Sequence, residues 1–286
     1  MITCYLMGGL GNQLFQICTT ISYAIHTNTN PVFVYSDKTN GITERATYWN
    51  TFLKSIAHMA VDSLPCPKLQ YIKEKGFHYT PLPLPVQLNL HNANICLFGY
   101  FQSYKYFDKD KYTLFRLIQI EKQKQILRNI YKYDTDNIIS MHFRLGDYKK
   151  IQDKHNILPV SYYKNALQTL LSKIQESELP KIKVLYFCEA HDEIEVNSMI
   201  ARLKETFNDI LFEPINPKIS DWQQVIIMSS CKYNIIANST FSWWGAYFNV
   251  QYQKMVCYPE QWFGPALTNN STNDLFPEDW FSVPIH

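Results

Sequence analysis

The chain has 286 residues, a length that fits one large domain or two domains of ordinary size. Hydrophobic residues make up 46% of it, which is enough for a real core and excludes a largely disordered protein. The formal charge is only +2 and charges of both signs are well mixed, so the composition gives no reason to expect nucleic acid as a partner.

The N-terminal apolar run, residues 2–7, is too short for a signal peptide or a membrane span, and no other stretch approaches 18 apolar residues. We therefore expect a cytoplasmic protein without a membrane span. The seven cysteines are spread singly and include no Cys-x-x-Cys pair. Such spacing favours buried thiols in a reducing compartment over a disulfide framework.

The chain opens on a pattern of strand, glycine turn and helix: a buried strand at residues 2–7, a turn at 8–11 and an amphipathic helix at 12–27. Glycines there let the backbone approach a ligand, and the helix start behind them favours negative charge. The spacing matches neither the dinucleotide fingerprint nor the phosphate loop. A simple tight turn is therefore the competing interpretation.

A strand is predicted at residues 31–35, followed by a proline-rich stretch without clear periodicity at residues 37–95. Long irregular segments are more often functional loops than filler, so we expect a variable, substrate-facing wall here. A strand and an aromatic turn follow at residues 96–106, and a solvated helix at residues 121–132. Asp108-Lys-Asp110 and Asp134-Thr-Asp136 match a pattern that can hold a divalent ion, although both also fit ordinary turns.

From residue 137 onward, strands and helices alternate. The predicted strands are residues 138–142, 183–188, 210–212, 233–237 and 255–258, and the predicted helices begin near residues 162, 194, 221 and 240. This alternation predicts a parallel sheet with helices on both faces and ligands at the carboxyl ends of the strands. Three loops, residues 142–148, 188–192 and 238–242, should therefore converge.

The stretch at residues 221–249 is the most informative. We expect Asp221 to cap a helix, a short strand to follow, and a second helix to begin among polar residues. Hydroxyls and backbone N–H groups at a helix start suit an anion such as a phosphate. The alternative is an ordinary N-cap followed by core aromatic residues. The polar residues are Asn238, Ser239, Thr240 and Ser242.

The turn after the predicted strand 138–142 places His142, Arg144 and Asp147 within six residues, with Gly146 allowing a sharp bend. The planar guanidinium of Arg144 suits two phosphate oxygens at once. An Arg144–Asp147 ion pair that only closes the turn is the alternative. Together with the polar helix start, these residues favour a diphosphate pocket.

Several motifs in this order resemble the α-1,2-fucosyltransferase family, and the likeness covers nearly the whole chain. The motifs are Gly8-Gly9-Leu10-Gly11-Asn12-Gln13, Gly99-Tyr-Phe-Gln-Ser-Tyr-Lys-Tyr-Phe, His142-Phe-Arg144-Leu-Gly146-Asp147-Tyr148, Asn238-Ser-Thr-Phe-Ser-Trp-Trp-Gly-Ala and Pro259 to Trp262. The resemblance implies an α/β, GT-B-like fold with two Rossmann-like domains facing a central cleft. We place the acceptor-side domain at residues 1–118 and the GDP-sugar domain at residues 119–286, with the C-terminal tail packing back on the first.

The resemblance further implies an inverting, metal-independent transfer of L-fucose from GDP-β-L-fucose, usually to O2 of a galactose in a glycan acceptor, with no cofactor. Arg144 would hold the donor pyrophosphate, and Asp147 and His142 are the candidate bases. The expected donor-binding residues are Gly9, Gly11, Asn12, Gln13, Arg144, Asp192, Asn238, Ser239, Thr240 and Ser242. The oligomeric state is left open.

Two positions depart from the family pattern. Leu145 stands where many members carry a second basic residue, and residues 188–192 form a longer, differently charged loop, in which Asp192 is the best match to a guanine-contacting residue. These departures keep another GDP-sugar or a non-galactose acceptor open as an alternative. A non-catalytic glycan- or nucleotide-binding protein is a further alternative, since the chain is rich in aromatic residues that would suit sugar stacking: Tyr100, Phe101, Tyr104, Trp243 and Trp244.

Overall fold

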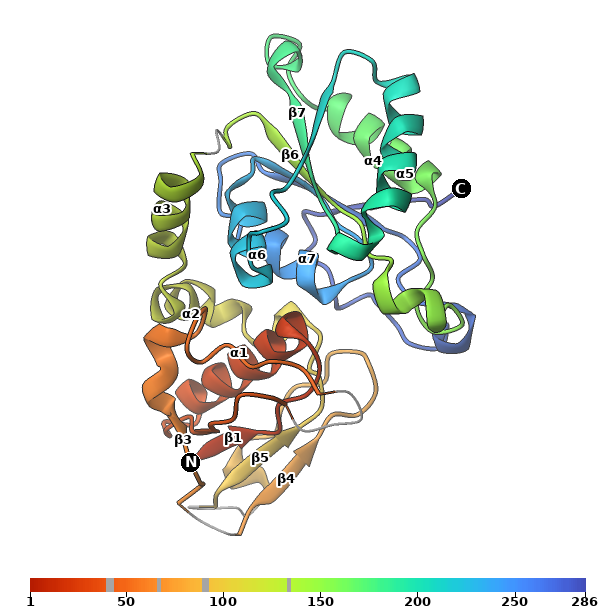
Figure 1. Cartoon of the computed structure of the whole chain (residues 1–286). Coiled ribbons are helices and arrows are strands. Elements are labelled where there is room, and N and C mark those ends of the chain that lie inside the picture. Colours follow the sequence, from red (N-terminus) through yellow and green to blue (C-terminus); the bar gives the residue numbers. More distant parts are fainter. Residues whose placement is uncertain (40–43, 66–67, 89–92, 133–134) are drawn as a thin grey trace. The chain divides into compact units, whose positions relative to one another are not determined.

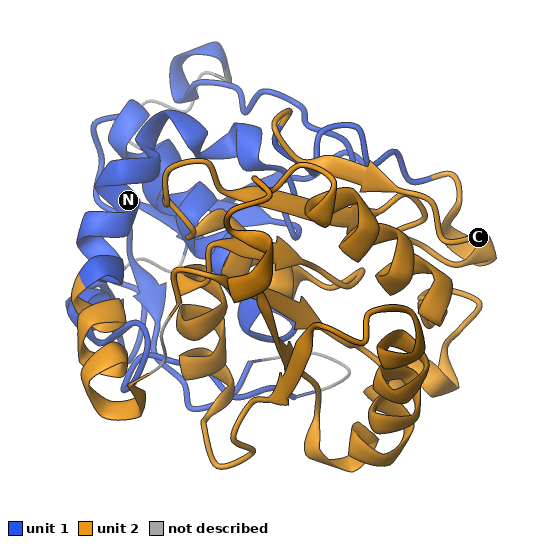
Figure 2. Ribbon diagram, turned by 90° about the horizontal axis from the view of Figure 1, so that it is seen from above, with its two compact units in different colours: residues 1–121, 270–277 blue, residues 122–269, 278–286 orange. Residues whose placement is uncertain are grey.

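The computed structural model describes residues 1–39, 44–65, 68–88, 93–132 and 135–286. The chain forms two compact units, coloured separately in Figure 2. Unit 1 comprises residues 1–121 and 270–277, and unit 2 comprises residues 122–269 and 278–286. Each unit is built on a parallel sheet with helices, so the predicted α/β class is confirmed.

Unit 1 contains a three-stranded parallel sheet in the order β1-β5-β4 and a separate parallel pair, β2-β3. Helix α1 begins directly after the glycine turn, with Gly9 at its N-cap, and helix α2 follows the last strand. The bounds are β1 (Ile2–Cys4), α1 (Leu10–His26), β2 (Phe33–Val34), β3 (Ala60–Val61), β4 (Gln70–Lys73), β5 (Ile95–Phe98) and α2 (Lys111–Ile118). Strands β3 and β4 lie in the stretch that the sequence predicted to be irregular.

Unit 2 contains a six-stranded parallel sheet in the order β11-β10-β9-β6-β7-β8. Figure 1 shows α4 and α5 on one side of this sheet and α6 and α7 on the other. The strands are β6 (Ile138–His142), β7 (Lys183–Phe187), β8 (Leu211–Pro214), β9 (Tyr233–Ile235), β10 (Met255–Pro259) and β11 (Phe281–Val283). The helices are α3 (Ile120–Tyr131), α4 (Val160–Leu171), α5 (Glu193–Thr206), α6 (Asp221–Ser230) and α7 (Thr240–Tyr247).

Short 3₁₀ helices connect these elements, and two of them, η5 and η7, carry residues of the candidate site. They are η1 (Lys54–Met59), η2 (Pro85–Leu88), η3 (Tyr104–Tyr106), η4 (Asp108–Asp110), η5 (Gly146–Lys150), η6 (Leu179–Lys181), η7 (Ala190–Asp192) and η8 (Pro265–Leu267).

The start of α6 differs from the sequence prediction. The N-cap is Ser220, not Asp221, which is the first helical residue. Ser220 forms a capping box with Gln223, so the side chains and backbone N–H groups of the first turn satisfy each other. Asp221 contributes its negative charge to the first turn, where the helix dipole favours it.

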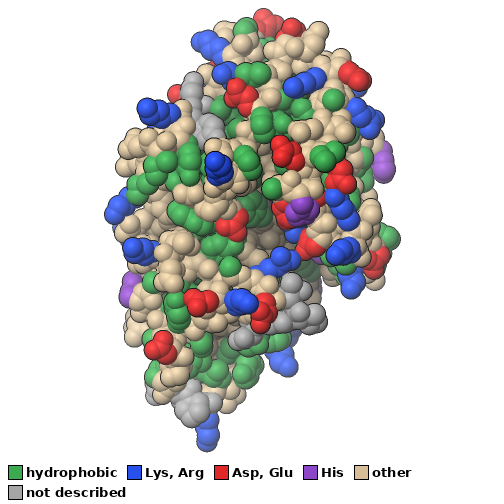
Figure 3. Space-filling model, viewed as in Figure 1, with side chains coloured by type: hydrophobic (Ala, Val, Ile, Leu, Met, Phe, Trp, Pro, Cys, Tyr) green, Lys and Arg blue, Asp and Glu red, His purple; other side chains and the backbone are tan. Residues whose placement is uncertain are grey.

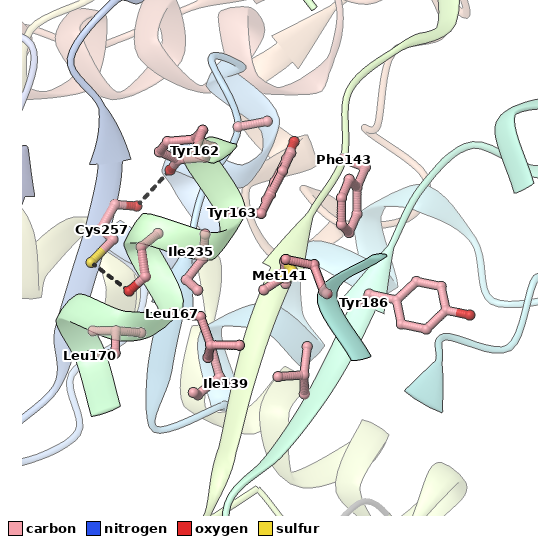
Figure 4. Close-up of a cluster of buried hydrophobic side chains, with 14 of the residues drawn as sticks. Ile139, Met141, Phe143, Tyr162, Tyr163, Leu167, Leu170, Tyr186, Ile235 and Cys257 are labelled. Atoms are coloured by element: carbon pink, nitrogen blue, oxygen red, sulfur yellow. Dashed lines mark hydrogen bonds between the residues drawn. The ribbon is translucent and has the colours of Figure 1, made fainter. Parts of the chain in front are cut away.

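The core of unit 2 lies between the sheet and helices α4 and α5. Alternate strand residues point to this side because side chains in a strand alternate between the two faces. Figure 4 shows the aromatic and aliphatic residues of α4 packed over these strand residues. The residues labelled there are Ile139, Met141, Phe143, Tyr162, Tyr163, Leu167, Leu170, Tyr186, Ile235 and Cys257.

The other face of the central strands holds a buried polar network. Ser140 of β6 and Asn234 of β9 are register partners, and the Asn234 amide donates to the Ser140 hydroxyl over 2.7 Å and to the Met228 carbonyl over 2.9 Å. The Asn249 amide donates to Asn234 Oδ1 over 2.8 Å and to the Cys231 carbonyl over 2.8 Å. Asn234 therefore ties the two central strands to the ends of α6 and α7.

The described cysteines are free thiols, and all but the partly buried Cys188 are buried. Burial raises the pKa of the Cys4 thiol to about 12, which keeps it protonated at neutral pH. The free, buried thiols agree with the prediction made from the cysteine spacing. The seventh cysteine, Cys66, lies outside the described residues.

On the molecular face in Figure 3, acidic and basic side chains are interspersed rather than gathered by sign. In the described parts of the chain, no helix combines the length and hydropathy needed to cross a bilayer.

The Asn234 network yields a stability prediction. Asn234→Ala should lower the free energy of unfolding by about 2–4 kcal/mol, because the buried Ser140 hydroxyl, the Met228 carbonyl and the Asn249 amide each lose a partner. Urea unfolding followed by circular dichroism measures the change. The exposed Asn208→Ala serves as the control and should shift it by less than about 0.5 kcal/mol. Equal effects of the two substitutions would contradict a structural role for the network.

Candidate functional site

The order of strands in unit 2 defines a place for a ligand. The chain moves outward from β6 through β7 to β8, then returns to β9 on the other side and moves outward through β10 to β11. This is the order of a doubly wound dinucleotide-binding sheet, which binds ligands at the carboxyl ends of the two strands where the direction reverses. Here those strands are β6 and β9, and the loops after them carry Arg144 and residues 238–242.

Arg144 lies two residues beyond the end of β6 and is held from three sides. Its Nη2 donates to Asp147 Oδ1 over 2.5 Å, and its Nη1 donates to Glu189 Oε1 from the loop after β7. Its guanidinium carbon lies 5.1 Å from the centre of the Tyr148 ring, in cation–π geometry. The side chain is 20% exposed, so a fixed cation reaches the surface at the switch point.

The turn that carries Arg144 depends on Gly146 and Asp192. Gly146 has φ of +35°, and a Cβ at this position would lie 3.0 Å from Glu189 Oε2. Its N–H donates to Asp192 Oδ2 over 2.6 Å. The loop after β7 thereby fixes the backbone of the loop after β6.

Asp192 is fully buried, and both of its oxygens have partners. Besides the Gly146 N–H, it accepts a hydrogen bond from Lys149 Nζ over 2.8 Å. Burial acts to raise the pKa of Asp192, but these two hydrogen bonds outweigh it and hold the pKa below its usual range. The carboxylate is therefore ionised at neutral pH, and because it is fully buried, a guanine could reach it only if the residues that cover it moved.

His142 is the last residue of β6 and is almost completely buried. Its ring lies 5.4 Å from that of Phe241 at the start of α7, and its Nδ1 is buried without a hydrogen-bond partner. Burial and, to a smaller degree, the charge of Arg144 lower the pKa of His142 to about 3. The imidazole is thus neutral and shielded from solvent, whereas the Asp147 carboxylate is partly exposed and is the more accessible of the two candidate bases.

The polar residues after β9 form a tightly bonded turn. The Ser239 hydroxyl caps α7 by accepting the Phe241 N–H over 3.3 Å, and the Ser242 hydroxyl accepts the Ala237 N–H over 3.2 Å. The Asn238 amide donates to the Asn156 carbonyl over 2.8 Å. Asn238, Ser239 and Ser242 are buried and shape the turn, whereas Thr240, the first helical residue, is partly exposed.

Tyr148 joins the two sides of the switch point. Its hydroxyl donates to the Asn238 carbonyl over 3.0 Å, while its ring lies under Arg144 and stacks on His155 at 4.7 Å. The structure therefore brings together the three loops that the sequence predicted to converge, with Arg144, Asp147, Asp192 and residues 238–242 among them.

The predicted donor-binding residues at the N-terminus lie in unit 1. Gly9 caps α1, Gly11 lies inside its first turn, and Asn12 is partly exposed and accepts a hydrogen bond from Gln102 over 3.0 Å. Gln13 is buried and donates to the carbonyls of Gly8 and Ala46, each over 2.9 Å. Gln13 therefore holds the glycine turn, and Asn12 is the more accessible of the two side chains.

Three residues of the loop after β7, Glu189, His191 and Asp192, have ligand atoms close enough to hold a metal ion. The same carboxylates already accept hydrogen bonds from Arg144 and Lys149. In the first Asp-x-Asp pair, Asp110 accepts a hydrogen bond from Ser22 over 2.5 Å and pairs with His26 at 3.0 Å. Asp134 of the second pair lies outside the described residues.

Lys149 and Glu189 are two members of this cluster to which the sequence prediction gave no role. A lysine soon after one strand and acidic residues after the next are visible in the sequence, and they indicate that ion pairs can form between the two loops. The pattern does not show which cation meets which carboxylate, because that depends on the register of β6 and β7 and on the turn at Gly146.

A parallel α/β unit with an arginine and a helix start at its switch point is typical of proteins that bind phosphorylated ligands. Comparison with known families then assigns it: residues 1–283 match the model described as "Glycosyl transferase family 11". The chain belongs to this family, the α-1,2-fucosyltransferase family that its motifs resemble, and is a glycosyltransferase of that family.

Two curated proteins of Escherichia coli are similar over their whole length. One, named O-antigen biosynthesis glycosyltransferase WbnK, is 26% identical, with 99% of this chain and 100% of that protein covered. The other, named α-1,2-colitosyltransferase, is also 26% identical, with 99% of each covered. Among solved structures, an Arabidopsis thaliana FUT1 variant in complex with GDP is similar, with a TM-score of 0.49, 11% identity, and coverage of 91% of this chain and 71% of that one.

The geometry of Asp192 gives a second stability prediction. Asp192→Ala should lower the free energy of unfolding by about 1–3 kcal/mol, because the buried Gly146 N–H and the Lys149 ammonium lose their shared acceptor. Asp192→Asn keeps one oxygen for the Gly146 N–H and should lose less. Chemical unfolding of the three proteins measures the difference, and an alanine variant as stable as the wild type would contradict the anchoring role.

The low pKa of His142 predicts a dependence of stability on pH. The unfolded chain binds a proton at His142 below about pH 6.5 and the folded chain only near pH 3, so this residue destabilises the fold as pH falls between those values. From pH 7 to pH 5, the wild type should lose about 1–2 kcal/mol more than His142→Phe. Urea unfolding at both pH values measures this, and parallel losses would show that His142 does not titrate in this way.

Proposed function

We propose that the protein is an inverting glycosyltransferase that moves L-fucose from GDP-β-L-fucose to O2 of a galactose in a glycan acceptor, without a metal ion. The observation that carries the proposal is the position of Arg144, a fixed cation at the switch point of unit 2, in a chain that belongs to the fucosyltransferase family along its length. Departure of GDP leaves negative charge on its phosphate, which a fixed cation stabilises.

In the proposed reaction, the acceptor oxygen attacks C1 of the fucose from the face opposite to GDP. The bond between C1 and the phosphate oxygen breaks, its electron pair leaves with GDP, and a base takes the proton of the attacking hydroxyl. Arg144 and Thr240 at the start of α7 would contact the phosphates. Asp147 is the proposed base, since it is a half-exposed carboxylate in the Arg144 turn.

The other predicted roles fit this scheme at specific positions. Asn12 stays the predicted donor contact of the N-terminal motif, with Gly9, Gly11 and Gln13 shaping the turn before it. Asn238, Ser239 and Ser242 would hold the start of α7 in place for the phosphate. The acceptor is expected to contact the stretch at residues 37–95. A cytoplasmic location stays our prediction and is supported by the free thiols.

A donor that carries colitose, the 3-deoxy form of L-fucose, is the second candidate. The similarity to a protein named α-1,2-colitosyltransferase favours it, because that protein is as similar to this chain as the other curated relative. A single hydroxyl separates the two sugars, so the donor pocket alone decides between them. A glycan- or nucleotide-binding protein without catalysis is the third candidate and would bind GDP without releasing it from any donor.

The test of the reaction is GDP release from GDP-β-L-fucose and from GDP-colitose across a panel of β-galactosides and other sugars, with EDTA present. Release that depends on a galactoside, with product analysis showing the α-1,2 linkage, is expected for GDP-β-L-fucose. Loss of activity with EDTA, restored by a divalent ion, would contradict metal independence, and Glu189, His191 and Asp192 would then be the first ligands to test by substitution. GDP binding without release from either donor would contradict catalysis.

Arg144 gives the kinetic prediction. Arg144→Ala should reduce kcat/KM roughly 10²-fold or more, because the leaving phosphate loses its fixed cation. Arg144→Lys should recover only part of this, since an ammonium is a point charge on a flexible stem and lacks the planar set of N–H donors that Asp147 holds in place. Arg202→Ala on the exposed side of α5 is the matched control and should keep wild-type activity. Undiminished transfer by Arg144→Ala would refute the assignment of the phosphate site.

A further inference from the structure

Glu189 occupies part of the proposed phosphate site. It is the second residue after β7, and its carboxylate accepts a hydrogen bond from Arg144 Nη1 while Asp147 accepts one from Nη2. A guanidinium presents its strongest contacts to an anion as a fork of two N–H groups. In this structure, carboxylates of the protein itself therefore take both terminal nitrogens of Arg144.

The two carboxylates differ in how readily they can leave. Asp147 is three residues from Arg144 on the same turn, so the chain keeps it close. Glu189 reaches across from the neighbouring strand, is 40% exposed, and has a second partner within reach, because His191 Nε2 lies 3.3 Å from its Oε2. Glu189 can thus move away from Arg144 without disturbing the Gly146 turn, which Asp192 holds.

We infer that Glu189 is an affinity-determining residue: its carboxylate competes with the donor diphosphate for Arg144 and must leave Arg144 for GDP to bind. The inference rests on the proposed function, in which Arg144 holds the phosphates. A phosphate oxygen and a carboxylate oxygen make the same charge-assisted bond to Nη1, so a diphosphate that binds there has to displace the carboxylate or lie against its negative charge. The carboxylate also repels the diphosphate while it remains in place.

The inference predicts an unusual gain of binding on mutation. Glu189→Gln should bind GDP about five- to tenfold more tightly than the wild type, the gain expected from releasing a partly exposed ion pair and removing a nearby like charge. Inorganic pyrophosphate should show the same gain, because the competition concerns the phosphates alone. Isothermal titration calorimetry at fixed salt measures both.

Glu195→Gln is the matched control. Glu195 is also exposed and follows the same strand, but its carboxylate pairs with Lys149 instead of Arg144. The substitution removes the same charge and should change GDP affinity less than about twofold. Equal gains in both variants would contradict displacement at Arg144 and indicate only a change in net charge. In an Arg144→Ala background, Glu189→Gln should give no gain, and a gain retained there would also overturn the inference.

A contrary role for Glu189 has its own signature. If its carboxylate accepted hydrogen bonds from guanine, Glu189→Gln would weaken GDP binding, leave pyrophosphate unchanged and reduce the preference for GDP over ADP. That result would overturn the inference. A third outcome is that the wild type transfers no fucose while Glu189→Gln still binds GDP and pyrophosphate more tightly. That outcome would contradict the proposed reaction and support the competition at Arg144. Unchanged affinity for both ligands in Glu189→Gln would refute the competition directly.

Discussion

The hydrogen bond between Asn234 and Ser140 joins the two strands on which the whole of unit 2 depends. These residues are paired on the two central strands, β6 and β9, from which the strand order runs outward to β8 on one side and to β11 on the other. Both side chains are buried beneath α6 and α7. The Asn234 amide also donates a hydrogen bond to the Met228 carbonyl near the end of α6. The pair therefore fixes the position of β9 and of the turn between β9 and α7. The loops with Arg144 and residues 238–242 extend from these same two strands, so the spacing between them is set in the core.

The site then adds a second level of organisation, made of charges. Each of its two cations lies between two carboxylates: Arg144 between Asp147 and Glu189, and Lys149 between Asp192 and Glu195. One pairing is buried at Asp192 and holds the backbone of the turn, while the pairing at Glu189 is exposed. Burial therefore separates the acid that maintains the structure from the acid that a ligand can replace. Because these carboxylates fix the Arg144 guanidinium, it is in position before a ligand binds. A preorganised cation stabilises developing negative charge without first having to reorient.

Particular residues show what the sequence could predict. Residues 138–142 were placed without error because a continuous buried run between polar segments specifies a central parallel strand. The family was identified from ordered motifs and is confirmed. Asp221 was the wrong cap because the adjacent Ser220 is an equally favourable cap residue, and only the backbone geometry decides which of the two closes the first turn. The partners of Asp192 and Glu189 could not be predicted, since each pairing spans more than 40 residues and depends on side-chain geometry. Strand β11 was not predicted, because Phe281–Val283 forms no continuous apolar run and its place beside β10 depends on the path of the C-terminal segment.

The path of the chain through its two units has a consequence for how such a protein can change over time. After residue 269 the chain enters unit 1 for eight residues, where the Asp274 side chain and backbone bind Lys105, Tyr79 and Ser103, and it then returns to unit 2 to add β11 beside β10. Neither unit is therefore a single continuous stretch of gene. An exchange of one whole unit between homologous genes needs three junctions, after residues 121, 269 and 277. A single crossover instead separates β10 from the β11 strand of the same parent, or Asp274 from the unit 1 residues that bind it in the same parent. The two units would thus diverge by point substitution within their loops more readily than by exchange of whole units.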